Sequence, residues 1–185
     1  DPHRGINTLY VEPISQAAAD QRAGRAGRTA PGRCLRLWTA QEHRGRVVHE
    51  VPEIRRIDLA EIFLILQAQG IADIRTFPWL EAPEEAATAR AQQLLRDLGA
   101  TDPTTGQITA LGQRMVSFPV HPRYARMLMA GHTYGCTREA ALIAALTQTQ
   151  DILMRRPPRH IQEARERVLG DRSDSDFFIL MLAWR

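Results

Sequence analysis

Residues 21–28 read QRAGRAGR, and this octet guides the interpretation of the whole sequence. Arginine recurs at every third position, and a glycine precedes the second and the third arginine. We expect the octet on a helix, where the arginines repel one another and each interior glycine costs about 1 kcal/mol relative to alanine. An anionic partner would compensate, and a triphosphate suits because guanidinium groups bind phosphate oxygens in bidentate fashion. A solvated arginine face is the alternative.

The composition is that of an ordinary globular protein. Of the 185 residues, 44% are hydrophobic and 24% are charged, all 24 basic residues are arginines, and the formal net charge is +3. This charge is too small to establish nucleic-acid binding by itself. The longest apolar stretches, such as residues 62–66, are too short to span a bilayer, so we expect a cytoplasmic protein without a membrane partner. Cys34 and Cys136 lack metal-type spacing and are expected to be buried free thiols.

Most of the chain after the octet is predicted to be helical. One helix should begin at Asp58, where Asp58 and Glu61 form a capping pair, and should end at Gly70. A second should run from about Pro83 to Gly99. The residues expected to face inward are Leu59, Ile62, Phe63 and Leu66 in the first helix, and Ala87, Ala91, Leu94, Leu95 and Leu98 in the second.

A turn and a small ribbon follow the second helix. Residues 102–106 have turn chemistry, residues 107–109 are expected to form a short strand, and residues 110–116 a short helix. Two helices followed by a small ribbon indicate a winged helix. Further helices, typical of the start of a helical bundle, are expected at residues 124–134, 137–148 and 161–169, and at residues 177–184 with Asp176 as N-cap.

The octet resembles motif VI of the DEAH-box helicases, including their bacterial HrpA and HrpB branch. Other segments resemble landmarks of this family in the same order along the chain, and the resemblance covers essentially the whole sequence. It implies a mainly α chain with the end of a RecA-like α/β domain (residues 1–46), a winged helix (residues 47–118) and the start of a ratchet-like helical bundle (residues 119–185). The segments that carry the resemblance are residues 14–17, 31–34, 52–56, 94–100, 111–112, 119–123 and 150–152.

The resemblance implies that the octet forms half of an ATP site between two RecA-like domains. Gln21 is expected to help place the attacking water or the γ-phosphate, and Arg25 and Arg28 are expected to act as arginine fingers. Arg22 either contacts phosphate or pairs with an acidic group of its own domain.

Two strand predictions concern the RecA-like part. Residues 8–11 form a strand-like run without a neighbouring strand, so we expect the chain to be part of a longer protein. Residues 33–37 are interpreted as the last strand of the domain, with Arg33 and Arg36 on its exposed face.

Other parts of an ATP site do not occur in this sequence. It has no Gly-rich phosphate-binding loop, no acidic DExH tetrad and no lysine. ATP and Mg²⁺ are therefore expected as cofactors of the full-length enzyme, together with upstream RecA-like domains. The chain alone is predicted to bind neither cofactor, to hold no metal and to lack ATPase activity.

The resemblance also implies that the winged helix and the bundle close a channel around single-stranded RNA or DNA. Arg155, Arg156 and Arg159 lie beside two prolines and are candidates for phosphate contacts, although an arginine-rich surface loop without a function is the alternative. His121 and His160 have no partner at a metal-type spacing and are expected to be surface or capping residues.

Two functions of other classes stay open. A winged-helix regulator that reads duplex DNA would need a basic recognition helix, but Arg90 and Arg96 share their helix with Glu84, Glu85 and Asp97. An interaction scaffold would leave the arginine octet without a purpose. Nucleotide-dependent behaviour of the full-length protein would separate both from a helicase.

Overall fold

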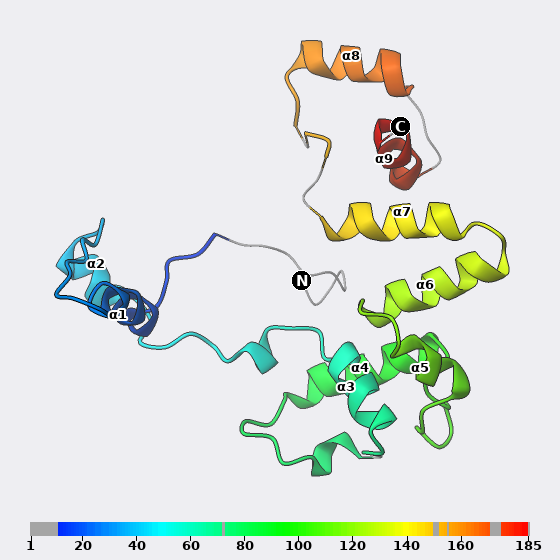
Figure 1. Cartoon of the computed structure of the whole chain (residues 1–185), viewed down its shortest axis with the longest axis horizontal. Coiled ribbons are helices and arrows are strands. Elements are labelled where there is room, and N and C mark those ends of the chain that lie inside the picture. The colour runs from blue at the N-terminus through cyan, green and yellow to red at the C-terminus, as the bar shows by residue number, and fades with distance from the viewer. Residues whose placement is uncertain (1–10, 72, 150–151, 155, 171–174, 185) are drawn as a thin grey trace. The chain divides into compact units, whose positions relative to one another are not determined.

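The computed structural model describes residues 11–71, 73–149, 152–154, 156–170 and 175–184, and their regular secondary structure is helical (Figure 1). No strand occurs in these ranges, and the nearest feature is an isolated antiparallel bridge between Thr101 and Ile108. The chain divides into two compact units, residues 1–59 with 75–92 and residues 60–74 with 93–185. The prediction of a mainly α chain is confirmed.

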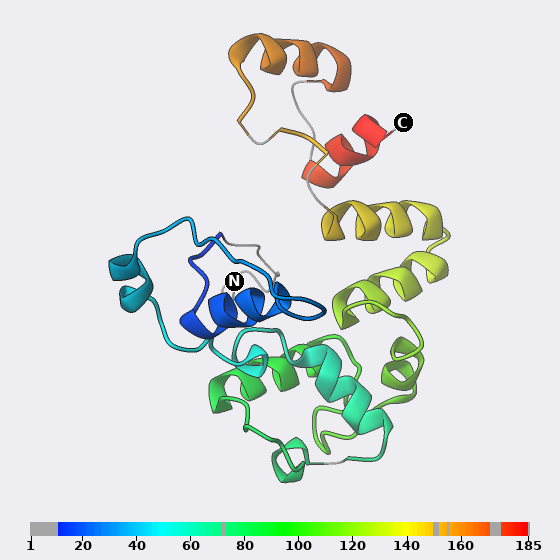
Figure 2. The ribbon, with the colours of Figure 1, turned by 60° about the vertical axis from the view of Figure 1, so that its left-hand side comes forward.

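The first unit begins with two short helices that have complete N-terminal caps. The Ser15 hydroxyl accepts a hydrogen bond from the Ala18 amide at the start of α1 (Gln16–Arg25). Thr39 and Glu42 form a reciprocal capping box at the start of α2 (Ala40–Gly45). Because first-turn amides of a helix have no partner within it, such caps fix where each helix begins. After α1 the chain turns back along the helix toward α2 (Figure 2).

The segment after α2 accepts hydrogen bonds from the first backbone amides of α1. The Gln16 amide donates to the Val47 carbonyl at 2.9 Å, and the Ala17 amide donates to the Val48 carbonyl at 3.0 Å. Farther along, Arg55 at the end of the 3-10 helix Glu53–Arg55 pairs with Glu81 at 2.7 Å. The first unit is therefore held together by polar contacts between segments distant in sequence.

The second unit starts with a small apolar core. α3 (Ala60–Ala68) packs against α5 (Ala110–Met115) and α6 (Pro122–Thr133), and α4 (Glu85–Asp97) adds its C-terminal end to this unit. The side chains of Phe63, Leu95 and Met115 are at most 1% exposed. α3 and α4 are each followed by a glycine with positive φ, Gly70 at +90° and Gly99 at +70°, as predicted from the sequence.

A tight turn follows α4. The Asp102 carboxylate accepts hydrogen bonds from the amides of Thr104 (2.9 Å) and Thr105 (2.7 Å), and Gly106 has φ +71°. The turn was predicted correctly. The short strand expected at residues 107–109 is reduced to the single bridge at Ile108.

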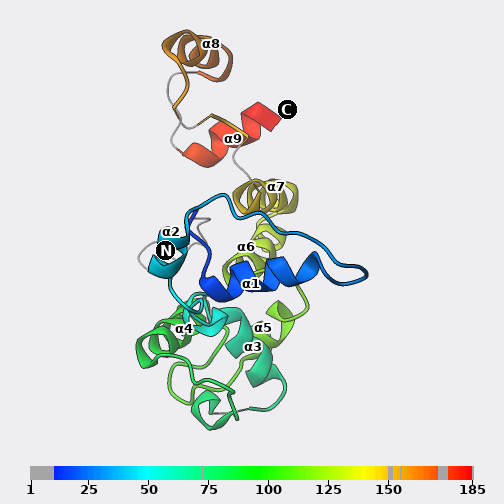
Figure 3. The same ribbon diagram turned by 90° about the vertical axis from the view of Figure 1, so that its left-hand side faces the viewer.

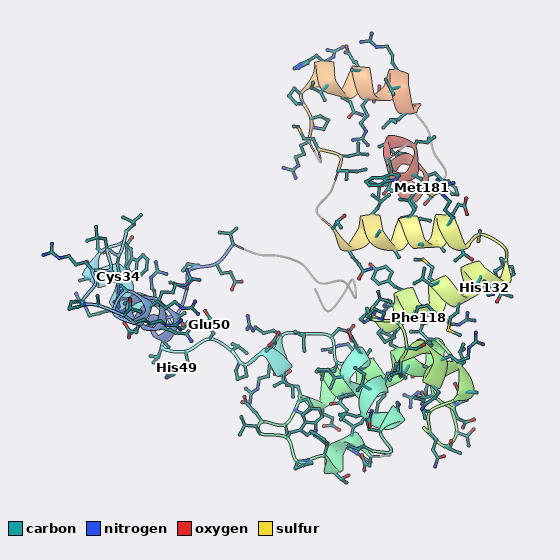
Figure 4. The ribbon with its side chains drawn as sticks, viewed as in Figure 1. Cys34, His49, Glu50, Phe118, His132 and Met181 are labelled. Carbon is teal, nitrogen blue, oxygen red and sulfur yellow. The ribbon has the colours of Figure 1, made fainter. Side chains whose placement is uncertain are left out.

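The remaining helices form the predicted bundle. α6 and α7 (Thr137–Gln148) are adjacent in sequence and pack side by side, α7 packs against α9 (Asp176–Trp184), and α9 packs against α8 (Arg159–Leu169) (Figures 1 and 3). Met181 is the buried residue of α9 (Figure 4). The expected N-cap Asp176 is instead the first helical residue, and the Ser175 hydroxyl accepts from the Phe177 amide at 3.3 Å.

Two expectations are wrong. Residues 33–36 have no regular structure and Leu37 lies in a bend, because no described segment pairs with them and an unpaired strand is unstable. Cys34 and Cys136 are both exposed free thiols rather than buried ones, and Figure 4 labels Cys34. The strand expected at residues 8–11 lies outside the described residues except for Val11.

Candidate functional site

The arginine octet occupies the C-terminal part of α1 and the turn beyond it. Gln21 and Arg25 are four residues apart and Arg22 and Arg25 three apart, so Arg25 neighbours both on the helix surface. The helix ends at Arg25, where the Ala26 amide bonds to the Ala23 carbonyl and the chain turns. The helical prediction therefore holds for Arg25 and fails for Arg28, which lies past the helix end.

The polar side chains of the octet are exposed and pair with no described residue. Among the described residues, Gln21, Arg22, Arg25 and Arg28 have no ion pair or side-chain hydrogen bond, and all four are exposed. The pairing with an acidic group considered for Arg22 is absent from the described part of the chain. Arg22 and Arg25 lie in the last turn, where the helix dipole favours cations and offsets part of their repulsion.

Gly24 and Gly32 differ in their surroundings. A Cβ atom on Gly24 would meet nothing within 4 Å, so the helix surface beside Arg25 is open. A Cβ atom on Gly32 would lie 1.8 Å from the Ala26 carbonyl oxygen. Gly32 therefore allows the returning chain to pass directly against the C-terminal end of α1, which closes the loop that carries Arg28.

Arg36 joins α1 to α2. Its Nη2 atom donates to Asp20 Oδ1 at 2.5 Å, and its Nη1 atom lies 3.1 Å from His43 Nε2. Arg36 was interpreted as the exposed face of a strand, and that interpretation is wrong. This contact could not be predicted from the sequence, because Asp20 and Arg36 are 16 positions apart and no periodicity relates them.

Arg46 forms a second junction, at the N-terminal end of α1. Its guanidinium carbon lies 4.3 Å from the centroid of the Trp38 ring, and its Nη1 atom donates to the Ile14 carbonyl at 3.0 Å. The Gln16 side chain donates to the Arg46 carbonyl at 2.9 Å. Trp38 is a half-buried platform for this arginine.

A shallow open depression lies beside the octet within the first unit. Its lining is Ser15, Ala17, Ala18, Gln21 and Glu50, and Figure 4 labels Glu50. Gln21 is the octet residue that reaches it. The depression opens to solvent, so Gln21 can contact a molecule that lies against this side of α1.

The candidate nucleic-acid contacts lie in the second unit. Arg156 is exposed, and the exposed Arg159 pairs with Glu163 at 2.9 Å, whereas Arg155 lies outside the described residues.

His121 caps α6 by accepting from the Arg123 amide at 3.3 Å, which confirms the capping alternative for this histidine. Within the described ranges, no group of three or more His, Cys, Asp and Glu side chains could hold a metal ion. No helix in those ranges is long and apolar enough to cross a bilayer.

Comparison with protein families defines the class of the second unit. Residues 91–120 match the family described as "Helicase associated domain (HA2), winged-helix", and residues 121–180 match "Helicase associated domain (HA2), ratchet-like". The winged helix and ratchet-like bundle predicted from the sequence are therefore confirmed. The predicted boundaries after residues 46 and 118 stay predictions.

Individual relatives give the same classification. The chain is 36% identical over 98% of its length to the pre-mRNA-splicing factor ATP-dependent RNA helicase prp22 of Schizosaccharomyces pombe, and 38% identical over 97% to the ATP-dependent RNA helicase HrpA of Escherichia coli. Its fold matches the crystal structure of Escherichia coli DEAH/RHA helicase HrpB with a TM-score of 0.70 and 28% identity over 100% of the chain. This chain belongs to the DEAH/RHA helicase family. It spans 16%, 14% and 22% of the lengths of these three proteins.

Proposed function

We propose that this chain supplies the arginine half of an ATP site, and the accessory domains that line a single-strand channel, within an ATP-dependent RNA or DNA helicase. Residues 1–46 would belong to a RecA-like domain, residues 47–118 to the winged helix and residues 119–185 to the ratchet-like bundle. Both sequence relatives bear the name ATP-dependent RNA helicase, which favours RNA as the substrate. A cytoplasmic location is part of the same proposal.

One observation carries the catalytic part of the proposal: three exposed guanidinium groups lie within one helix end and the turn after it, unpaired with any described residue. Arg22, Arg25 and Arg28 would each be stabilised by a phosphate, whose oxygens match the guanidinium fork. Gly24 leaves open space beside Arg25, so a phosphate or another backbone can approach the helix closely.

The side chains of the octet suit the phosphate groups of ATP but not the Mg²⁺ ion that accompanies them. Gln21 and Arg25 share one face of α1, so an amide and a guanidinium can act on the same phosphoryl group. Arg25 and Arg28 would offset negative charge that develops during phosphoryl transfer, and Gln21 would orient the attacking water. Mg²⁺, which neutralises phosphate charge in such sites, would need carboxylate or hydroxyl ligands from elsewhere in a longer protein.

The accessory part of the proposal depends on the second unit. Arg156 is exposed next to two prolines, and such a cation suits contact with a phosphate of a single strand. Arg159 is less available, because Glu163 already holds its guanidinium group.

The test uses the complete protein that contains this chain. Arg25→Ala should lower nucleic-acid-stimulated ATP hydrolysis by about 10³- to 10⁵-fold, because an arginine finger contributes that much. ATP affinity should fall far less, since most of the contacts that bind the phosphates are expected from other domains. Arg33→Ala is the matched control, because Arg33 is exposed in the same unit and the same charge is removed. Turnover of Arg25→Ala close to that of Arg33→Ala would refute the finger assignment.

A further inference from the structure

We propose that Arg36 is a positioning residue, which holds the octet half of α1 against α2 and so fixes where Gln21 and Arg25 point. The consequence for catalysis rests on the proposed function, whereas the contact itself does not. Arg36 does not belong to the octet, and its guanidinium group lies on neighbours rather than in open solvent.

α1 needs external support because its own sequence stabilises it poorly. Ala19 is its only buried residue, the arginines of its last turn repel each other, and Gly24 lowers its helix propensity. Most of the stability of a helix this short must come from contacts with the rest of the protein.

The two ends of α1 are supported differently. Its N-terminal turn is fixed by the Ser15 cap, by the carbonyls of Val47 and Val48, and by the hydrogen bond that the Gln16 side chain donates to the Arg46 carbonyl. In the half that carries the octet, Asp20 to Arg36 is the only side-chain hydrogen bond or ion pair to another segment among the described residues. Loss of that contact would leave the octet half of the helix without a side-chain hydrogen bond or ion pair to another described segment.

The geometry of Arg36 suits a link between two elements. One guanidinium nitrogen reaches Asp20 on α1, the residue directly before Gln21, and another reaches His43 on α2. A planar fork can hold two partners in fixed directions, which a lysine ammonium does less well. Arginine can only donate, so this hydrogen bond requires the His43 tautomer with its proton on Nδ1, an atom that has no hydrogen-bond partner among the described residues.

Exposure separates a positioning role from a purely stabilising one. The Arg36 and Asp20 side chains are 30% and 67% exposed, and ion pairs so open to solvent contribute little to stability. A small displacement of a catalytic group, by contrast, can cost about 100-fold in rate. Arg36 should therefore affect turnover much more than thermal stability.

The experiment compares variants of the complete protein. Arg36→Gln should lower kcat for ATP hydrolysis about ten- to hundredfold, with KM for ATP and the melting temperature nearly unchanged. Asp20→Asn should have the same effect, and the double variant should be no slower than either single variant, because both remove one link. Arg36→Lys should recover part of the lost kcat. Arg33→Gln, an exposed arginine without a described partner, should behave as wild type.

Hydrogen exchange of the same proteins tests the contact independently of activity. Arg36→Gln should accelerate amide exchange in residues 20–25, and Arg33→Gln should not. Equal exchange in the two variants, or equal kcat, would overturn the positioning role. A wild-type protein without nucleic-acid-stimulated ATPase activity would instead refute the proposed function, and the exchange result would still decide whether Arg36 holds α1.

Discussion

Arginines with the same charge have different surroundings in this chain. Arg36 and Arg46 are held by a carboxylate, a histidine, a carbonyl and an aromatic ring, whereas Arg22, Arg25 and Arg28 have no described partner. The regular, local spacing of Arg22, Arg25 and Arg28 is visible in the sequence, which is why these three could be singled out as candidate site residues. The sequence did not predict the surroundings of Arg36 and Arg46, because each contact joins residues far apart in the chain, and only folding brings them together.

At the residue scale, Asp102 should make the stability of its turn depend on pH. Hydrogen bonds from the Thr105 and Thr104 amides, and then from the Thr105 hydroxyl, lower the pKa of the Asp102 carboxyl. A group with a lowered pKa in the folded state stabilises it above its unfolded pKa, and the stabilisation is lost as the pH falls through the folded value. The turn should therefore weaken only below about pH 4, the ordinary value for aspartate.

Carboxyl ¹³C NMR titration of Asp102 measures this directly. Its midpoint should lie below the ordinary value of about 3.9. Asp102→Asn provides the control, since the difference in melting temperature between the chain and this variant should shrink as the pH is lowered. A midpoint at or above the ordinary value would contradict the prediction.

At the scale of elements, helices were predictable and strands were not. The signals that define a helix, which are capping residues, apolar periodicity and a glycine after its end, lie close together in the sequence, so α3, α4 and α7 are close to their predicted bounds. A strand depends on a partner elsewhere in the chain, and residues 33–36 have none among the described residues. The ribbon after α4 does have a partner, but α5 begins at Ala110, and the pairing is limited to the bridge between Thr101 and Ile108.

The hairpin of α6 and α7 depends on a close approach at Gly131. A Cβ atom there would lie 2.7 Å from the Ala140 Cβ atom, which is fixed to the backbone of α7. Gly131→Val should therefore force the helices apart and lower the free energy of unfolding by about 1–3 kcal/mol, measured by thermal or urea denaturation. The matched control is Gly24→Val in α1, where a Cβ atom meets nothing within 4 Å. A loss at Gly131 no larger than the loss at Gly24 would contradict the prediction, because valine has a higher helix propensity than glycine and only the close approach to Ala140 makes the Gly131 variant unfavourable.

At the scale of the whole molecule, the two proposed tasks lie in different units. The octet and Arg36 are in the first unit, and the matched winged-helix and ratchet-like segments begin at residue 91, at the end of the first unit, and continue through the second. Either task can therefore be altered by substitutions that leave the other in place. Changes in the octet should affect ATP turnover, and changes beside Pro157 and Pro158 should affect nucleic-acid affinity.

The chain itself should bind single-stranded oligonucleotides weakly, with little sequence preference and with an affinity that falls steeply as salt increases, because phosphate contacts release counterions. Fluorescence anisotropy at several salt concentrations measures the slope of log affinity against log salt. Arg156→Gln should reduce this slope by about 0.7, the value for one phosphate contact on a single strand.

The Arg159 pair predicts a ranking that a general charge effect would not give, because the loss of affinity at Arg156 should exceed the loss at Arg159. Glu163 competes with phosphate for the Arg159 guanidinium, 2.9 Å away, so Glu163→Gln should raise the affinity and Arg159→Gln should lower it by less than Arg156→Gln does. Arg114→Gln on α5 removes an equal, exposed charge and should change little. If Arg114→Gln weakened binding as much as Arg156→Gln, the contact would be diffuse and the assignment to the segment around Arg156 would be wrong. A tight, sequence-selective duplex complex at physiological salt would favour a DNA-reading winged helix instead.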